Sequence, residues 1–206
     1  MRFYDPTEGE ILLNGKNIKE YHLQKYRALF ATAFQDHQIF SLSVMENVLM
    51  RKATVEDEKA VVEALTMAGV YDKICSLPQG IHTMLTREFS EDGAVLSGGE
   101  YQKIVVARAF VKESPFKIFD EPSSALDPIA EYELFEQILL SGKEKTMLFI
   151  SHRLSSVQNA DYVYMLEHGA VVEEGSHAEL MKKKGQYAEM YTKQAVNYLA
   201  REEVVV

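Results

Sequence analysis

Two short segments near the middle of the chain carry residue types that suit phosphate chemistry. The first is Ser97-Gly98-Gly99, at which a run with helical spacing of apolar residues begins. Free backbone N–H groups and the helix dipole favour an anion at such a start. The second is a short apolar run ending in adjacent carboxylates, Asp120 and Glu121, which could hold a metal ion and act as a general base. Each segment alone is also common in ordinary turns and strand ends, so neither predicts a function by itself.

The composition is that of a folded protein, with 47% hydrophobic and 26% charged residues. The formal charge of −9, from 22 basic and 31 acidic side chains, argues against a nucleic-acid partner, because such binding needs a basic surface. The single cysteine, Cys75, excludes an internal disulfide, and we expect it to be buried as a small apolar side chain. No apolar run reaches the ~20 residues of a membrane-spanning helix.

Short apolar strands are predicted to lead to the polar residues. Phe116 to Phe119 precedes the two carboxylates, and Leu29 to Phe34 and Thr146 to Ile150 are further strands of this kind. Pro115 ends the helical pattern before the carboxylates, and Pro128 opens the next helix at a favourable first-turn position. In α/β sheets, ligands bind at the ends of such strands.

Local turn and capping signals predict further elements. Asn14-Gly15 and His168-Gly169 are expected to form hairpin turns. Ser176 with Glu179 forms a capping box that predicts a helix start.

The faces of two elements can be predicted from periodicity. Strand alternation places Lys117 on the face opposite to Asp120, and we expect its ammonium group to reach water near the start of the strand. In the helix after the carboxylates, we expect a solvated face formed by Glu131, Glu133 and Glu136.

In this order, the two segments resemble two motifs of ATP-binding cassette (ABC) ATPases. L-S-G-G-E at Leu96 to Glu100 resembles the signature motif, and the run ending in D-E-P resembles the Walker B strand. Ser124 to Asp127 resembles the D-loop, Gln35 the Q-loop glutamine, and His152 the switch histidine. Five motifs in the order of the family, over nearly the whole chain, make the resemblance specific.

The resemblance implies an α/β fold with a P-loop NTPase-like (RecA-like) parallel sheet core that is incomplete at its N-terminus. An inserted helical subdomain is implied as well. We expect residues 1–41 and 116–206 to form the partial ATPase core and residues 42–115 to form the helical signature subdomain.

The resemblance also implies ATP and Mg²⁺ as cofactors. Asp120 would hold Mg²⁺, and the amide oxygen of Gln35 would reach the same ion and the attacking water. Glu121 would orient and deprotonate that water, and His152 would steady the γ-phosphate. These are the residues for which the resemblance implies catalytic and metal-binding roles.

The remaining implied site residues contact nucleotide from the signature motif and the D-loop. They are Ser97, Gly98, Gly99, Glu100 and Asp127, and the signature helix start would grip the γ-phosphate bound by a second cassette. The implied partners are therefore a second cassette, identical or different, and the transmembrane domain of an exporter. The implied location is the cytoplasmic face of a membrane.

One motif of the family is absent from the 206 residues. The Walker A loop, G-x-x-x-x-G-K-[ST], has no match, because Gly15-Lys16 is followed by Asn17 and Gly142-Lys143 by Glu144. We expect the chain to be an N-terminally truncated cassette that alone binds ATP weakly or not at all.

Two alternatives to an exporter ATPase stay open from the sequence. One is a non-enzymatic cassette that only donates its signature motif to a partner. The other is a soluble ABC protein of repair or translation. The stretches F-Y-D-P-T-E-G-E-I and S-H-R-L-S-S-V resemble exporters and favour the exporter ATPase.

Overall fold

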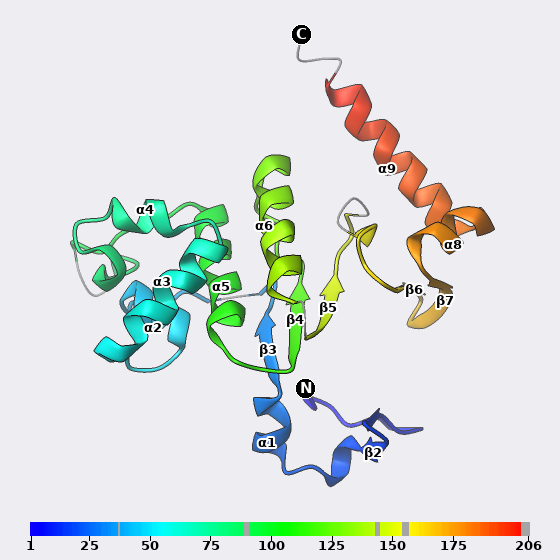
Figure 1. Ribbon diagram of the computed structural model, residues 1–206, viewed down its shortest axis with the longest axis horizontal. Coiled ribbons are helices and arrows are strands. Elements are labelled where there is room, and N and C mark those ends of the chain that lie inside the picture. The colour runs from blue at the N-terminus through cyan, green and yellow to red at the C-terminus, as the bar shows by residue number, and fades with distance from the viewer. Residues whose placement is uncertain (37, 89–90, 143–144, 154–156, 203–206) are drawn as a thin grey trace. The chain divides into compact units, whose positions relative to one another are not determined.

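The computed structural model describes residues 1–36, 38–88, 91–142, 145–153 and 157–202, with side chains as far as residue 195 (Figure 1). The chain divides into two compact units, Met1–Ile150 and Ser151–Val206. Each unit is described by itself.

The first unit contains a parallel three-stranded sheet in the order β3-β4-β5 (Figure 1). Its strands are β3 (Phe30–Ala33), β4 (Phe116–Asp120) and β5 (Thr146–Ile150). In the register, Ala33 pairs with Phe119, and Asp120 pairs with Ile150. Parallel strands end at the same edge of a sheet, so the segments that follow β3 and β4 begin side by side. The three predicted strands are confirmed.

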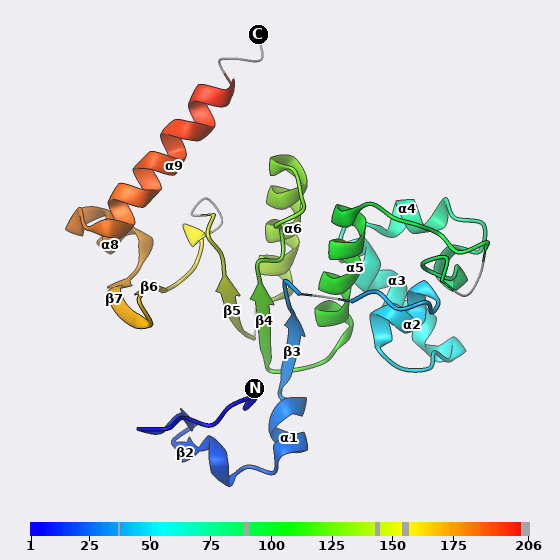
Figure 2. The same ribbon diagram turned by 180° about the vertical axis from the view of Figure 1, so that it is seen from behind.

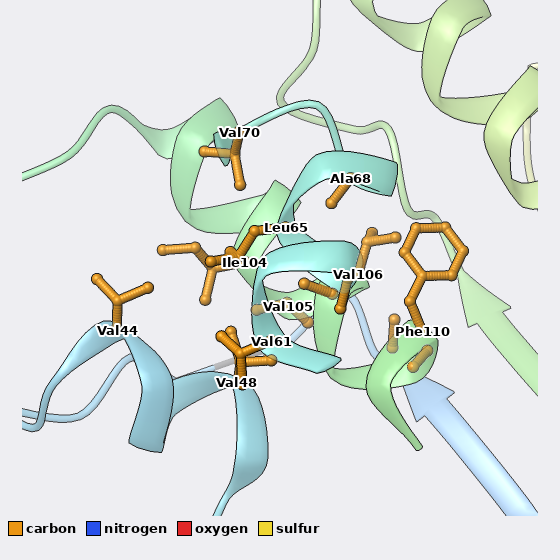
Figure 3. Close-up of a cluster of buried hydrophobic side chains, with 14 of the residues drawn as sticks. Val44, Val48, Val61, Leu65, Ala68, Val70, Ile104, Val105, Val106 and Phe110 are labelled. Atoms are coloured by element: carbon orange, nitrogen blue, oxygen red, sulfur yellow. The ribbon is translucent and has the colours of Figure 1, made fainter. Parts of the chain in front are cut away.

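Helices α2 to α5 make most of the hydrophobic core of this unit. They are α2 (Val44–Leu49), α3 (Glu58–Met67), α4 (Tyr71–Cys75) and α5 (Gly98–Val111). Side chains of α2, α3 and α5 meet in the cluster of Figure 3, where Val44, Leu65 and Ile104 are each 0% exposed. The long helix α5 also packs on β3 and β4, so it connects this helical core to the sheet.

Phenylalanine rings join the sheet to the helices on one face of β4. Phe119 is 0% exposed, and its ring stacks on Phe149 of β5 with centroids 5.3 Å apart. Phe110 of α5 lies 6.2 Å from Phe119, and Phe135 of α6 (Pro128–Ser141) lies 5.6 Å from Phe149. The strand that ends at Asp120 is therefore held by aromatic packing on this face.

The N-terminal part of the first unit is a hairpin followed by a short helix. Strands β1 (Leu12–Leu13) and β2 (Lys16–Asn17) pair antiparallel across Asn14-Gly15, whose φ angles are 51° and 76°. Two positive φ values are what a tight hairpin turn requires, so the predicted turn is confirmed. A 3-10 turn (Ile18–Glu20) and α1 (Leu23–Ala28) lead on to β3.

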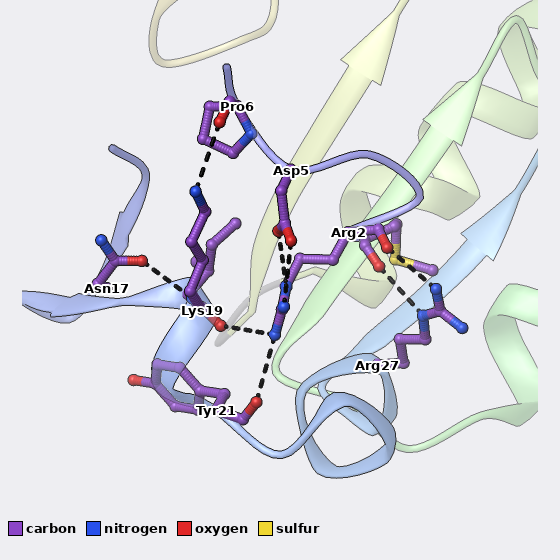
Figure 4. A network of polar contacts seen from close by, with 9 residues as sticks. Arg2, Asp5, Pro6, Asn17, Lys19, Tyr21 and Arg27 are labelled. Carbon is purple, nitrogen blue, oxygen red and sulfur yellow. Dashed lines mark hydrogen bonds and ion pairs between the residues drawn. The ribbon is translucent and has the colours of Figure 1, made fainter. Parts of the chain in front are cut away.

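Two arginines fasten the first residues to this part of the chain (Figure 4). Arg2 donates from Nη1 to the carbonyl oxygen atoms of Ile18 (3.1 Å) and Tyr21 (3.3 Å). Arg27 of α1 donates to the carbonyl oxygen atoms of Met1 (3.2 Å) and Arg2 (3.0 Å). The N-terminal segment is thus held by hydrogen bonds from arginine side chains to backbone carbonyl groups. These acceptors are present whatever side chain the accepting residue has.

The second unit is a hairpin with two helices. Strands β6 (Val163–Glu167) and β7 (Ala170–Gly175) pair antiparallel, and α8 (His177–Lys183) and α9 (Gln186–Glu202) follow (Figure 2). Ser176 and Glu179 form the predicted capping box. Among the described residues of both units, no helix is both long and apolar enough to cross a membrane.

Three expectations about side-chain exposure are wrong. Cys75 is exposed at the end of α4. Glu131 is only 5% exposed, because it turns inward and accepts a hydrogen bond from the buried hydroxyl of Ser123 at 2.8 Å. Lys117 does not reach water: it is 2% exposed, and its Nζ lies 5.3 Å from the centre of the Phe110 ring. Glu133, on the same helix as Glu131, is exposed as expected.

The buried Lys117 leads to a prediction of pH-dependent stability. Burial and the positive charge of the nearby Lys145 lower the pKa of Lys117 from its ordinary value of 10.5. The negative charge of Glu113 acts in the opposite direction but does not outweigh them. We expect Lys117→Met to raise the free energy of unfolding at pH 7 by about 1–3 kcal/mol, because it removes a charge that folding takes out of water.

The stability gained by Lys117→Met should shrink as the pH rises from 7 towards 10. Below the lowered pKa, the lysine of the wild type is charged in both the folded and the unfolded chain, so the full cost of burying its charge is present. Between the lowered pKa and 10.5, only the unfolded chain keeps the proton, so the wild type gains stability with pH. Urea unfolding at several pH values measures this, with the exposed Lys25→Met as control. A pH-independent difference for Lys117→Met would contradict the prediction.

Candidate functional site

The carboxyl edge of the parallel sheet brings three predicted site residues together. Asp120 is the last residue of β4, and Glu121 follows it. Gln35 comes two residues after β3, whose last residue Ala33 pairs with Phe119. Asp120 and Glu121 are half-buried and Gln35 is exposed, so all three side chains are at least partly accessible at this edge.

Glu121 has an unusual backbone conformation. Its φ is 46°, in the left-handed region that a residue other than glycine adopts at an energetic cost. Its N–H donates to the carbonyl oxygen of Ile150 at 2.9 Å. Its own carbonyl oxygen accepts from Ser124 N at 3.3 Å and from the side chain of Gln102 at 2.9 Å. These bonds hold the peptide groups on both sides of Glu121.

The start of α5 is organised by a capping box. Ser97 Oγ accepts from Glu100 N at 3.3 Å, and Glu100 Oε2 accepts from Ser97 N at 2.7 Å. Burial would raise the pKa of Glu100, but these hydrogen bonds and the charge of Lys73 outweigh it, so the pKa is lowered. Ser97 and Gly98 are exposed. The start of the helix therefore lies at the surface with its first N–H groups, which suits an anion.

Gly99 allows the start of α5 to lie against the segment that follows Glu121. A Cβ atom on Gly99 would be 3.1 Å from the carbonyl oxygen of Ala125 and 3.1 Å from Cδ2 of Leu126. A Cβ on Gly98 would be 4.0 Å from the Cβ of Ala125, an ordinary contact. Gly99 is thus the glycine that the close approach requires.

Asp127 caps the next helix. Its Oδ1 accepts from Ile129 N and Ala130 N, each at 3.0 Å. The bond from Ala130 is the main cause that lowers the pKa of Asp127, and burial opposes it only in part. The side chain is ionised at neutral pH and fixes where α6 begins.

Gln102 is a residue that the sequence analysis missed. It is 3% exposed, and its amide bonds to Glu121, Ser124 and Ala125. The signal was present in the helical spacing. Gln102 precedes the buried residues Val105, Val106 and Ala109 by three, four and seven positions, so it belongs to the apolar face of α5. A buried amide must find hydrogen-bond partners, and here they come from the segment after β4.

Arg108 and Asn47 were also missed. Arg108 of α5 donates to the carbonyl oxygen of Asn47 at 2.8 Å and to that of Gln38 at 2.9 Å. Burial lowers the pKa of Arg108 to about 10, so it stays charged at neutral pH. Asn47 is 0% exposed and exchanges two bonds of 2.9 Å with the backbone of Phe40. α5 therefore also fixes the segment that follows Gln35.

The comparison with protein-family models decides what kind of site this is. The model described as "ABC transporter" matches residues 1–124, which is more than half of the chain. The chain belongs to the ABC transporter family. The predicted membership is confirmed, and so is the P-loop NTPase-like α/β fold.

Known relatives agree with this membership. A protein of Staphylococcus aureus strain NCTC 8325 named "Putative multidrug export ATP-binding/permease protein" is 42% identical over 191 residues, 93% of this chain and 32% of that protein. Its counterpart in the bovine strain RF122 is 40% identical over the same length. A solved bacterial Atm1-family ABC exporter with ATP bound matches with a TM-score of 0.85 and 35% identity, over 94% of this chain and 33% of that one. The chain spans about a third of the length of these relatives.

The donor set at the sheet edge fits the magnesium ion that ABC ATPases use. Magnesium takes oxygen ligands and is usually held by one or two carboxylates together with phosphate and water. Asp120 supplies a carboxylate and Gln35 an amide oxygen at one edge. In the described part of the chain, no three histidine, cysteine, aspartate or glutamate residues form a metal cluster. Two protein ligands leave the remaining positions around the ion to phosphate and water, so these residues suit a site that nucleotide completes.

His152, the histidine that resembles the switch histidine, belongs to the second unit. It comes two residues after β5, and its carbonyl oxygen accepts from Nε2 of Gln194 in α9 at 2.8 Å. That bond fixes its backbone within the second unit. Its role at the nucleotide stays a prediction.

Proposed function

We propose that this chain is the nucleotide-binding part of an ABC exporter and that it hydrolyses ATP in a dimer of cassettes. In this proposal, residues 1–41 and 116–206 act as the ATPase core and residues 42–115 as the helical signature subdomain. The chain works at the cytoplasmic face of a membrane, next to the transmembrane domain of the exporter.

Each site residue has a chemical task in the proposal. Asp120 and Gln35 hold Mg²⁺, which neutralises phosphate charge when it is bound with ATP. Glu121 takes a proton from the attacking water, and His152 donates a hydrogen bond to the γ-phosphate. Ser97, Gly98, Gly99 and Glu100 form the helix start that contacts nucleotide on the other cassette, and Asp127 orders the D-loop beside it.

The observation that carries the proposal is the meeting of two motifs at the end of β4. The Walker B carboxylates lie at the carboxyl edge of a parallel sheet, where α/β proteins bind ligands. The signature helix α5 is bonded to that same strand end through Gln102. Together with the family membership, this arrangement supports an ATPase more than a binding module.

The native assembly that contains the chain is expected to hydrolyse ATP only with Mg²⁺. A tag on the chain allows the assembly to be purified from membranes of its own cells, and phosphate release is measured with Mg²⁺ and after chelation by EDTA. We expect hydrolysis with Mg²⁺ and background rates with EDTA, because the phosphate charge is then not neutralised. A tagged, folded assembly without Mg²⁺-dependent hydrolysis would contradict the proposal.

A second function is favoured by the motif content of the 206 residues. They hold a signature-like motif, L-S-G-G-E, but no G-x-x-x-x-G-K-[ST] loop. The chain expressed by itself is therefore expected to hydrolyse no ATP, and it could serve as a signature donor to a cassette that carries the loop. Mixing the two purified chains tests this: stimulation of the partner supports signature donation, and an unchanged rate speaks against it.

A further inference from the structure

The amide of Gln102 uses all of its N–H groups on the end of the Walker B strand and on the D-loop. Nε2 donates to the carbonyl oxygen of Glu121 at 2.9 Å and to Ser124 Oγ at 2.8 Å. Oε1 accepts from Ala125 N at 2.8 Å. A primary amide has two N–H donors, so both are satisfied, and the side chain is 3% exposed. One side chain thus fixes three groups that lie 19 to 23 residues further along the chain.

The group that Gln102 holds most directly is under backbone strain. Glu121 has a φ of 46°, and such a conformation persists only when the surroundings determine it. Its N–H is fixed by Ile150 on the neighbouring strand, and its carbonyl group is fixed by Gln102 and by Ser124 N. The direction of a side chain from Cα follows from the orientation of these two peptide groups. Holding the carbonyl group therefore also sets the direction in which the side chain of Glu121 leaves the backbone.

Close packing keeps Gln102 within reach. The start of α5 lies against Ala125, where Gly99 leaves no room for a side chain without a shift of its neighbours. Gln102 lies in the same helix, just after the capping box of Ser97 and Glu100. The helix is therefore fixed to the D-loop by packing and by hydrogen bonds at neighbouring points.

We propose that Gln102 is a positioning residue for ATP hydrolysis, which holds the carbonyl group of Glu121 and the amide of Ala125 so that the Glu121 carboxylate points at the attacking water. This inference rests on the proposed ATPase function. Gln102 touches no reacting atom, so its loss lowers kcat and leaves the KM for ATP nearly unchanged. Misplacement of a catalytic group by about 1 Å can cost up to about 100-fold.

Two variants separate the bonds of Gln102, and both are compared with a matched control. Gln102→Met keeps a similar length and removes all three bonds. Gln102→Glu keeps an acceptor for Ala125 N but places a carboxylate beside the carbonyl oxygen of Glu121. Gln79→Glu introduces the same charge at an exposed position of the same unit. The readouts are kcat and KM of the native assembly from pH 8 to 5.5, hydrogen exchange of the Ala125 amide, and the melting temperature.

We expect both Gln102 variants to lower kcat at pH 8 about 10- to 100-fold, with KM within about twofold. Activity of Gln102→Glu relative to the wild type should recover as the pH falls, because a protonated carboxyl group can again donate to the Glu121 carbonyl. Gln102→Met should show no such recovery. Exchange of the Ala125 amide should become about five- to tenfold faster in Gln102→Met and stay slow in Gln102→Glu.

Several results would overturn the inference. The first is an unchanged kcat in a folded Gln102→Met variant, and the second is a loss of kcat in Gln102→Glu that does not recover at low pH. The third is a collapse of the melting temperature in both variants, which would make Gln102 a structural residue only. If the wild-type assembly hydrolyses no ATP, the proposed function fails, but amide exchange still reports on Gln102. Unchanged exchange of Ala125 in Gln102→Met would then overturn the positioning role separately.

Discussion

Replacement of Glu121 by glutamine is expected to lower kcat for ATP hydrolysis by the native assembly by at least about 100-fold, while Mg-ATP still binds. The amide has the size of the carboxylate but cannot accept the proton of the attacking water. Glu121 is the half-buried residue directly after β4, and the bonds of its backbone to Ile150 and Gln102 do not depend on its charge. The substitution therefore removes a base and leaves these backbone bonds in place.

The control for this experiment is Glu133→Gln, which makes the same chemical change at an exposed position on α6. Phosphate release and the binding of a fluorescent ATP analogue are measured on both variants. A kcat for Glu121→Gln within twofold of the wild type would show that this carboxylate is not the base. The signature-donor function would then become the better account, because a donor contributes Ser97 and Gly98 but no general base.

Truncation of Phe119 to alanine is expected to lower the free energy of unfolding of the chain by about 3–5 kcal/mol. The ring is 0% exposed and contacts Phe149 and Phe110, so its removal leaves a cavity between the sheet and α5. Neighbouring side chains that sit in close-packed positions can fill such a cavity only in part. Few single substitutions in this chain should destabilise it as much.

Urea unfolding of the 206-residue chain measures the effect, with Tyr132→Ala as the matched control. Tyr132 is an aromatic residue of α6 that is 65% exposed, so its truncation should change the free energy of unfolding by about 0.5 kcal/mol or less. A loss below about 1 kcal/mol for Phe119→Ala would mean that the sheet and α5 close over the cavity, contrary to the close packing described above.

Local sequence determined much of what surrounds the site. The capping box at Ser176 forms as predicted, and the helix predicted to open at Ser97 begins with a second one. In each box a serine and a glutamate three residues apart pair with each other's backbone N–H groups, which requires no contact with distant residues. The Asn14-Gly15 turn needs only residues that tolerate positive φ. The five motifs and their order also identified the family correctly. The roles of the site residues that the motifs imply stay predictions.

Only the tertiary structure decided which polar side chains are buried and what they bind. Periodicity says which face of an element a residue occupies, but not which segment covers that face. Lys117 was expected to reach water, yet α5 places Phe110 beside its ammonium group. Glu131 was expected on a solvated face, yet Ser123 binds it in the interior. Gln102 matters for the same reason: its partners lie 19 to 23 residues away, and no local pattern specifies a contact at that distance.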